Sequence, residues 1–125
     1  MPRDVVTGSP EGEPTETDPR RWLADDEDVI GVLEGEGASL LATRRRIVIV
    51  RDGARSRPRS GVRSWPYDRI VRVSLVQPKR GQARILVQTG NYPWQVVSMF
   101  FDSRRWPDAA RLMGEIRRHV ANRSA

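Results

Sequence analysis

The stretch Leu40-Leu41-Ala42-Thr43-Arg44-Arg45-Arg46-Ile47-Val48-Ile49-Val50-Arg51-Asp52-Gly53 decides the fold class of this chain. It consists of two apolar runs joined by three arginines, and the second run ends at an Asp-Gly turn. Short runs rich in valine and isoleucine and bounded by turn residues are typical of β-strands. The stretch therefore predicts two consecutive strands, over 39–43 and 46–51, with the arginines in the turn between them.

Apolar runs separated by turn residues continue on both sides of this stretch. Turn residues recur at Gly35–Gly37, Pro78–Gly81 and Gly90–Pro93. Seven strands at intervals of roughly 8–12 residues predict an antiparallel barrel or sandwich that is closed or nearly closed. The expected strands cover residues 29–33, 39–43, 46–51, 61–65, 70–76, 84–89 and 94–101.

The pattern changes to a helical period after the last strand. Apolar residues spaced by three or four positions predict one amphipathic helix over about 106–121, capping an open end of the barrel. Pro107 suits its first turn, and Gly114 is expected to allow a close approach to the sheet. The apolar stripe consists of Ala109, Leu112, Met113, Ile116 and Val120.

The chain of 125 residues fits one domain preceded by a tail. Residues 1–20 contain four prolines and few apolar residues, which predicts a disordered acidic tail. The domain is expected to span 21–123, with Ala24–Asp28 forming a short helical turn. Trp22 is expected to dock on a barrel, either its own or another's. The absence of cysteine and of any long apolar run favours a cytoplasmic protein, at most peripheral at the inner face of the membrane.

The net charge of +6 is unevenly distributed. The first 28 residues carry nine acidic and three basic side chains, a net charge of −6, whereas the other 97 carry 19 basic and seven acidic ones, a net charge of +12. All basic residues except Lys79 are arginines. This composition has two interpretations, a codon-biased solvated surface and a polyanion-binding site.

Catalytic and metal-binding patterns are not found in the sequence. Without cysteine and with His119 as the single histidine, a nucleophile–base pair or a histidine metal cluster is hard to build. His119 is interpreted as a partner of the helix dipole. The acids of 25–28 lack calcium-loop spacing and are interpreted as a solvated helix start. Gly31, Gly35 and Gly37 are assigned to hairpin geometry, and we expect no enzyme and no cofactor.

Two clusters of basic residues are the candidate binding site. Alternate turns of such a sheet gather at the same end, so the two clusters are expected near one rim, where guanidinium groups could bind a phosphate or carboxylate. A solvated arginine-rich surface is the alternative. The candidates are Arg55, Arg57, Arg59 and Arg63 in the first cluster and Lys79, Arg80 and Arg84 in the second.

The aromatic residues also have two interpretations. Most of them lie beside prolines at strand ends, where large rings usually seal the corners of a small barrel, and we therefore expect core packing. Interleaved with arginine, they could instead stack on single-stranded nucleic acid, although no helix-turn-helix or RNP motif is present. The residues concerned are Trp65, Tyr67, Tyr92, Trp94 and Trp106.

Two segments resemble those of bacterial PH-like domains, members of the pleckstrin-homology superfold. The stretch from Leu40 to Val50 is similar to their "small residue, Leu, Thr, x, x, Arg, apolar" hairpin. Residues 65–73, Trp-Pro-Tyr-Asp-Arg-Ile-Val-Arg-Val, resemble their corner between the fourth and fifth strands. The resemblance covers about residues 26–121.

The resemblance implies seven strands, a terminal helix and a scaffold that binds lipids, peptides or proteins. Phosphoinositide-binding members use basic residues in the first inter-strand loop, whereas Glu34–Gly37 is acidic here. We therefore expect a non-enzymatic module for a protein or peptide partner. Attachment to anionic lipid through the arginine loops is the alternative, and nucleic acid is disfavoured.

Overall fold

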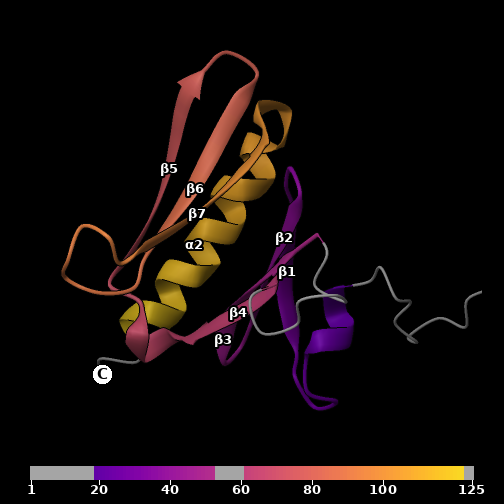
Figure 1. Cartoon of the computed structure of the whole chain (residues 1–125). Helices are drawn as coiled ribbons and strands as arrows, with labels where there is room; N and C mark the ends of the chain where they lie inside the picture. The colour runs from indigo at the N-terminus through magenta and orange to yellow at the C-terminus, as the bar shows by residue number, and fades with distance from the viewer. Residues whose placement is uncertain (1–18, 53–60, 123–125) are drawn as a thin grey trace, which may run out of the picture.

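A computed structural model of the chain describes residues 19–52 and 61–122 and shows a mainly β protein (Figure 1). The predictions for the tail over 1–18 and for the loop over 53–60 lie outside the described residues. Seven strands, one α-helix and three short 3-10 helices occur within the described ranges. In chain order these are η1 (Pro19–Trp22), β1 (Val29–Glu34), β2 (Ala38–Thr43), β3 (Arg46–Arg51), β4 (Val62–Pro66), η2 (Tyr67–Arg69), β5 (Arg72–Lys79), β6 (Gln82–Gln88), β7 (Val96–Asp102), η3 (Ser103–Arg105) and α2 (Trp106–Asn122).

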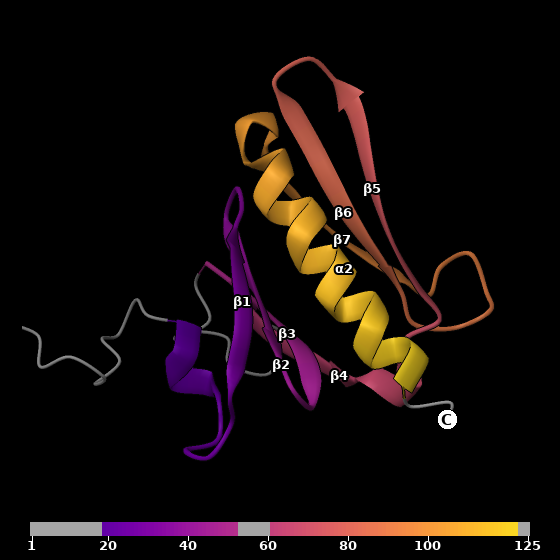
Figure 2. The same cartoon turned by 180° about the vertical axis from the view of Figure 1, so that it is seen from behind.

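The first sheet has the order β1-β2-β3-β4 and is antiparallel throughout. Its central strands are buried on both faces. Leu40 and Ile49 belong to the main core, whereas Leu41 and Val48 alternate with them and are equally inaccessible. The 3-10 helix η1, which ends at Trp22, lies against β2 on the side of the sheet turned away from α2 (Figures 1 and 2). Two-sided burial explains why these strands are continuously apolar.

The second sheet consists of β5, β6 and β7, also antiparallel. Every second residue of β6 is buried, so one face of the sheet covers the core. β5 runs on to Lys79, and the turn predicted over Pro78–Gly81 is therefore shorter than expected, with Gly81 at a φ of +81°. The register shifts between Val76 and Lys79, as expected where a proline cannot donate a ladder hydrogen bond.

The predicted strands coincide with the observed ones, with small shifts at their ends. Ile70 and Val71 precede β5, and Trp94 and Gln95 lie in the loop before β7 rather than in the strand. The last difference changes the surroundings of Trp94. Its side chain belongs to a turn and is not constrained by the alternation of a strand.

The C-terminal helix α2 was predicted correctly. It lies against β1 of the first sheet and β5 of the second, and so bridges the two sheets (Figures 1 and 2). The hydrogen-bonded ladders of the described strands form two separate sheets and do not close into one barrel. The core side of the helix comprises the buried Ala109, Leu112 and Ile116 and the partly buried Met113 and Val120.

The glycine that lets the helix approach the sheet is not the predicted one. Gly114 is exposed, and a Cβ atom there would meet nothing within 4 Å, so its predicted role was wrong. Gly31, on β1, has this role instead, because a Cβ atom there would lie 2.4 Å from Cδ1 of the buried Leu112. Gly31 was assigned to hairpin geometry, whereas its neighbour Gly37 does occupy the turn, with a φ of +71°.

The two sheets meet at two corners. At one corner the backbone N–H of Glu36, in the β1–β2 turn, donates to the carbonyl oxygen of Phe100 on β7 at 2.8 Å. At the other corner the buried Tyr67 of η2 donates its hydroxyl to the carbonyl oxygen of Thr43. Each corner therefore fixes one strand end of the first sheet against a neighbouring element.

Candidate functional site

The three arginines of the β2–β3 turn are paired with acids that precede β1. Arg45 Nη2 lies 2.8 Å from Asp26 Oδ2, and Arg44 Nε lies 3.6 Å from Asp28 Oδ2. Both of these pairs are exposed, so each contributes little to stability. The pairing neutralises the turn, which is therefore a poor candidate for a polyanion site.

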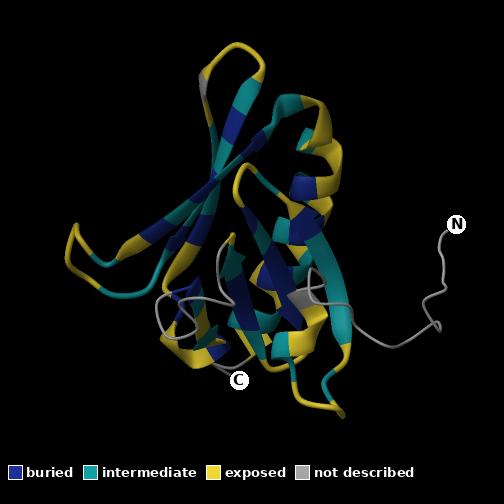
Figure 3. Cartoon of the chain, turned by 45° about the vertical axis from the view of Figure 1, so that its right-hand side comes forward, coloured by how far each residue is buried: buried dark blue, intermediate teal, exposed yellow. Residues whose placement is uncertain are grey.

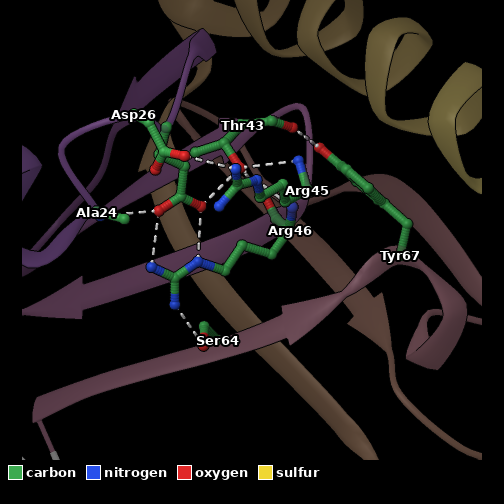
Figure 4. Close-up of polar contacts among 8 residues, drawn as sticks. Ala24, Asp26, Thr43, Arg45, Arg46, Ser64 and Tyr67 are labelled. Atoms are coloured by element: carbon green, nitrogen blue, oxygen red, sulfur yellow. Dashed lines mark hydrogen bonds and ion pairs between the residues drawn. The ribbon is translucent and has the colours of Figure 1, made fainter.

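The third pair, between Glu27 and Arg46, is different because the Glu27 side chain is only 2% exposed. Arg46 Nε and Nη2 donate to the two carboxylate oxygens at 2.7 and 2.8 Å (Figure 4). The Thr43 hydroxyl and the Ala24 backbone N–H also donate to the carboxylate, at 2.9 and 3.0 Å. The predicted helical turn over 24–28 is a turn without a helix, and its acids serve as ion-pair partners.

These contacts shift the pKa values of the cluster. The hydrogen bonds from Arg46 lower the pKa of Glu27 from 4.5 to about 2, against the opposing effect of burial. The same pair raises the pKa of Arg46. Burial and the nearby Glu27 charge raise the pKa of Tyr67 to about 12. At neutral pH the cluster is a fixed ion pair beside a neutral phenol.

The structure separates the candidate basic residues. Arg55, Arg57 and Arg59 lie outside the described ranges. Arg63, on β4, is exposed, and its guanidinium lies 5.1 Å from the Trp65 ring centroid. The others belong to the β5–β6 hairpin, with Lys79 and Arg80 exposed near its tip and Arg84 within β6.

The hairpin tip projects away from β4 in both views of the molecule (Figures 1 and 2). The fold thus does not bring Arg63 beside Lys79 and Arg80. Arg84 is half-buried, with its guanidinium 5.5 Å from the Phe100 ring centroid and its buried Nε without a hydrogen-bond partner. The described members of the two clusters do not form one cationic rim.

Exposed large apolar side chains lie on a different surface, which we call the aromatic patch. It consists of four large apolar side chains at the end of the second sheet where β6 leads into β7. The Val71 N–H donates to the Gln88 carbonyl oxygen, and Gln88 pairs with Val96, which places both valines beside the β6–β7 loop. The four residues are the exposed large apolar ones of the described chain, Val71 (47%), Tyr92 (59%), Trp94 (75%) and Val96 (41%).

The expectation of core packing was therefore wrong for Tyr92 and Trp94. It was right for Tyr67, which is buried, and for Trp65 and Trp106, which pack partly buried against the core. For Tyr92 the signal in the sequence was its position in the predicted turn Gly90–Pro93, whereas Trp94 was placed in the predicted strand 94–101 and gave no such signal. Alternation determines the direction of a side chain only within a strand.

The loop that carries the aromatic patch is held in one conformation by its own hydrogen bonds. Thr89 N–H donates to the Gln95 carbonyl oxygen at 2.8 Å, and Gln95 N–H donates to the Tyr92 carbonyl oxygen at 2.9 Å. The Gln95 side chain accepts from the Tyr92 N–H at 3.2 Å. The two rings stack nearly parallel, with centroids 4.7 Å apart and an interplanar angle of 8°. Figure 3 shows this loop projecting from the body as an exposed segment.

A cleft of about 340 Å³ lies between the end of β4 and this loop. Trp65 and Pro66 are the apolar residues of its lining. The exposed Arg69 of η2 is a cationic group at its side, and Thr89 and Gln95 connect the cleft to the aromatic patch. The lining residues are Ser64, Trp65, Pro66, Arg69, Thr89 and Gln95.

His119 lies elsewhere, at the end of α2. Its ring packs on Tyr67 with centroids 5.1 Å apart, and its Nδ1 is 3.0 Å from the Glu115 carbonyl oxygen. In the part of the chain that the structure describes, no three His, Cys, Asp or Glu side chains are grouped so as to hold a metal ion. No helix over the same residues is long and apolar enough to cross a membrane.

Comparisons of the chain with protein-family models, curated proteins and solved structures found no match.

Proposed function

We propose that this chain is a non-enzymatic binding module with a PH-like fold, and that it binds a protein or peptide partner through the aromatic patch and the adjoining cleft. The observation that carries the proposal is the stacked pair of Tyr92 and Trp94, exposed yet held in place by the hydrogen bonds of their loop. The two rings touch each other and form one exposed apolar surface, and continuous exposed apolar surfaces on small proteins commonly mark interaction sites.

The composition of the surface supports a protein partner. Tryptophan, tyrosine and arginine are the residues that contribute most to binding energy at protein interfaces. Here Trp94 and Tyr92 lie beside a cleft with Trp65 and Arg69 in its wall. A preformed loop loses little conformational entropy on binding, which favours affinity.

The PH-like part of the proposal rests on the order of the elements. A four-stranded sheet precedes a three-stranded sheet, a Pro66-Tyr67 corner joins them, and the terminal helix contacts β1 and β5. This order matches the resemblance found in the Leu40–Val50 hairpin and in residues 65–73. A solved structure of the chain that lacked this order would remove this part of the proposal and leave the binding surface unaffected.

The proposed function is tested by quantitative affinity capture with the full chain as bait. We expect one or a few proteins to be retained by the wild type and by Trp94→Phe, and to be lost with Trp94→Ala. Arg80→Gln, which removes a charge from the distant hairpin tip, serves as a matched control and should retain them. Captured proteins that are indifferent to Trp94→Ala would contradict the proposal.

Association with an anionic membrane is the second candidate function. The specific observation in its favour is that Tyr92 and Trp94 project on a loop near the exposed Arg69 and Arg72, since aromatic rings and arginines are favoured at membrane interfaces. Sedimentation with phosphatidylglycerol vesicles, and with single-stranded DNA as a second polyanion, tests it. If vesicle binding depends on Trp94 and persists at moderate salt, a lipid surface is the better candidate for the ligand than a protein partner.

A further inference from the structure

The cleft and the aromatic patch offer hydrogen-bond donors. The Arg69 guanidinium has no hydrogen bond or ion pair within the described ranges. The indole N–H groups of Trp65 and Trp94 can only donate, and the Trp94 side chain is 75% exposed. The amide nitrogen of Gln95 adds another donor, because its oxygen already accepts from the Tyr92 N–H.

Two acceptors of the same surface already receive hydrogen bonds. Ser64 Oγ accepts from Arg46 Nη1 at 3.0 Å. The Gln95 carbonyl oxygen accepts from both the N–H and the hydroxyl of Thr89. No carboxylate is among the residues that line the cleft. The surface therefore favours a ligand that brings a carboxylate or other acceptors to the Arg69 guanidinium and the indole N–H groups.

We propose that the occupant is an extended, acidic, proline-containing peptide segment of a partner protein. The inference rests on the proposed function and specifies the chemistry of the partner. Proline has no N–H, and a polyproline II segment keeps its carbonyl oxygens free to accept hydrogen bonds. Proline rings pack on aromatic side chains such as Trp94 and Tyr92, and a carboxylate can form a charge-assisted pair with Arg69.

Size and charge agree with this occupant. A volume of about 340 Å³ is at the lower end of the range for binding pockets, roughly 300–1,000 Å³, so the cleft accommodates only a short part of a peptide. The remainder would lie across the rings of the aromatic patch. The full chain carries a net charge of +6, which favours an acidic segment over a basic one.

The test uses the full chain and synthetic decapeptides of known composition. The main probe repeats Pro-Glu five times, and three comparison peptides repeat Pro-Gln, Ala-Glu and Pro-Lys. Calorimetry gives the dissociation constants, and the NMR signals of the indole N–H groups identify the tryptophans that are contacted. Circular dichroism confirms that each variant is folded.

We expect saturable binding of the Pro-Glu peptide and a loss of about tenfold on changing glutamate to glutamine, the size expected for a charge-assisted hydrogen bond. Trp94→Ala should weaken binding about thirtyfold, as for an interface hot spot. Arg69→Gln should lower the affinity for the Pro-Glu peptide to that for the Pro-Gln peptide and leave the latter nearly unchanged. Arg80→Gln should change either affinity by no more than about twofold at moderate salt.

Three outcomes would overturn the inference. The first is that the Pro-Glu peptide shows no saturable binding, and the second is that the Pro-Lys peptide binds equally well. The third is that Arg80→Gln weakens binding as much as Arg69→Gln does, because equal effects would indicate unspecific charge attraction. If proteins are captured in a Trp94-dependent way but the peptides do not bind, the proposed function is retained and only the proposed chemistry of the peptide is rejected. Trp94-dependent vesicle binding without protein capture would reject both.

Discussion

Glu27 is the residue at which local sequence and tertiary environment differ most. It belongs to a polar acidic run, yet its side chain is almost completely buried and receives hydrogen bonds from Arg46, Thr43 and Ala24. A buried carboxylate is tolerated when a guanidinium and further donors satisfy it. The pair also fixes the segment before β1 to the β2–β3 turn.

Glu27 gives a pH-dependent contribution to stability. Its pKa in the folded state, about 2, is below the ordinary 4.5, so the stabilisation is complete above pH 4.5 and is lost as the pH falls toward 2. We expect Glu27→Gln to lower the free energy of unfolding by about 3 kcal/mol at pH 7. The difference from the wild type, measured by urea denaturation, should shrink below pH 4.5 and approach zero near pH 2.

Asp26→Asn is the matched control for this experiment. The pair between Asp26 and Arg45 has a similar short distance, but both side chains are more than half exposed. We expect a change of no more than about 0.5 kcal/mol, with no comparable dependence on pH. Equal losses in the two variants would show that burial does not distinguish the two pairs.

Gln95 controls the order of the aromatic patch. Its side chain accepts from the Tyr92 N–H and lies against Gly90, where a Cβ atom would be 2.1 Å from the Gln95 Oε1. We expect Gln95→Ala to weaken the near-ultraviolet circular dichroism of the stacked rings and to change the free energy of unfolding by only about 1 kcal/mol. An unchanged aromatic signal would mean that the backbone hydrogen bonds alone order the loop.

At the scale of the elements, sequence patterns succeeded wherever the period was regular. The stripe from Ala109 to Val120 predicted both the existence and the buried face of α2. The Leu40–Val50 stretch predicted β2, β3 and their turn. The prediction of core packing failed for Tyr92 and Trp94, which lie in the loop between β6 and β7. There the chain leaves the ladder and side-chain direction depends on the turn geometry.

The two glycines at the helix should respond in opposite directions to alanine. Gly31→Ala would place a methyl group 2.4 Å from Leu112 Cδ1, and overpacking of this kind costs about 1–3 kcal/mol. Gly114→Ala meets nothing within 4 Å and should stabilise the helix by about 0.5–1 kcal/mol. Thermal unfolding of both variants checks the assignment. A destabilising Gly114→Ala would show that this position has a neighbour.

At the scale of the whole molecule, the fold depends on how two separate sheets are joined. The hydroxyl of Tyr67 secures one corner, and the bond from Glu36 to Phe100 secures the other. Helix α2 contacts the strands β1 and β5 and so spans the two sheets. The glycine-rich β1–β2 turn is therefore a structural contact, in addition to being a hairpin connection.

Gly35 should be sensitive to substitution for this reason. A Cβ atom there would lie 2.5 Å from the Phe100 carbonyl oxygen, the acceptor of the Glu36 N–H. We expect Gly35→Ala to lower the free energy of unfolding by about 3 kcal/mol, because a backbone atom cannot move aside as a side chain can. Gly114→Ala again provides the comparison. A neutral Gly35→Ala would show that the two sheets can separate slightly at this corner without cost.

In the folded molecule, acidic and basic segments that are separate in the sequence pair with each other. The acidic run and the arginine turn, about 19 residues apart, are mutual partners, as in the bonds from Glu27 to Arg46 and from Asp26 to Arg45. The predicted basic residues on the β5–β6 hairpin lie apart from Arg63 on β4 (Figure 1). The candidate site is instead an apolar surface with Arg69 at its side.

The sequence by itself determined the strands, the helix and its buried stripe, because periodicity records which side of an element is kept from water. It also indicated the mainly β class and the strands over 39–43 and 46–51. The folded structure was needed to show that the Glu27 side chain is shielded from solvent beside Arg46, that Gly31 rather than Gly114 lets the helix approach, and that Trp94 faces solvent beside a cleft. Those properties depend on contacts between residues distant in the chain or on turn geometry. Neither of these produces a periodic pattern of apolar residues in the sequence.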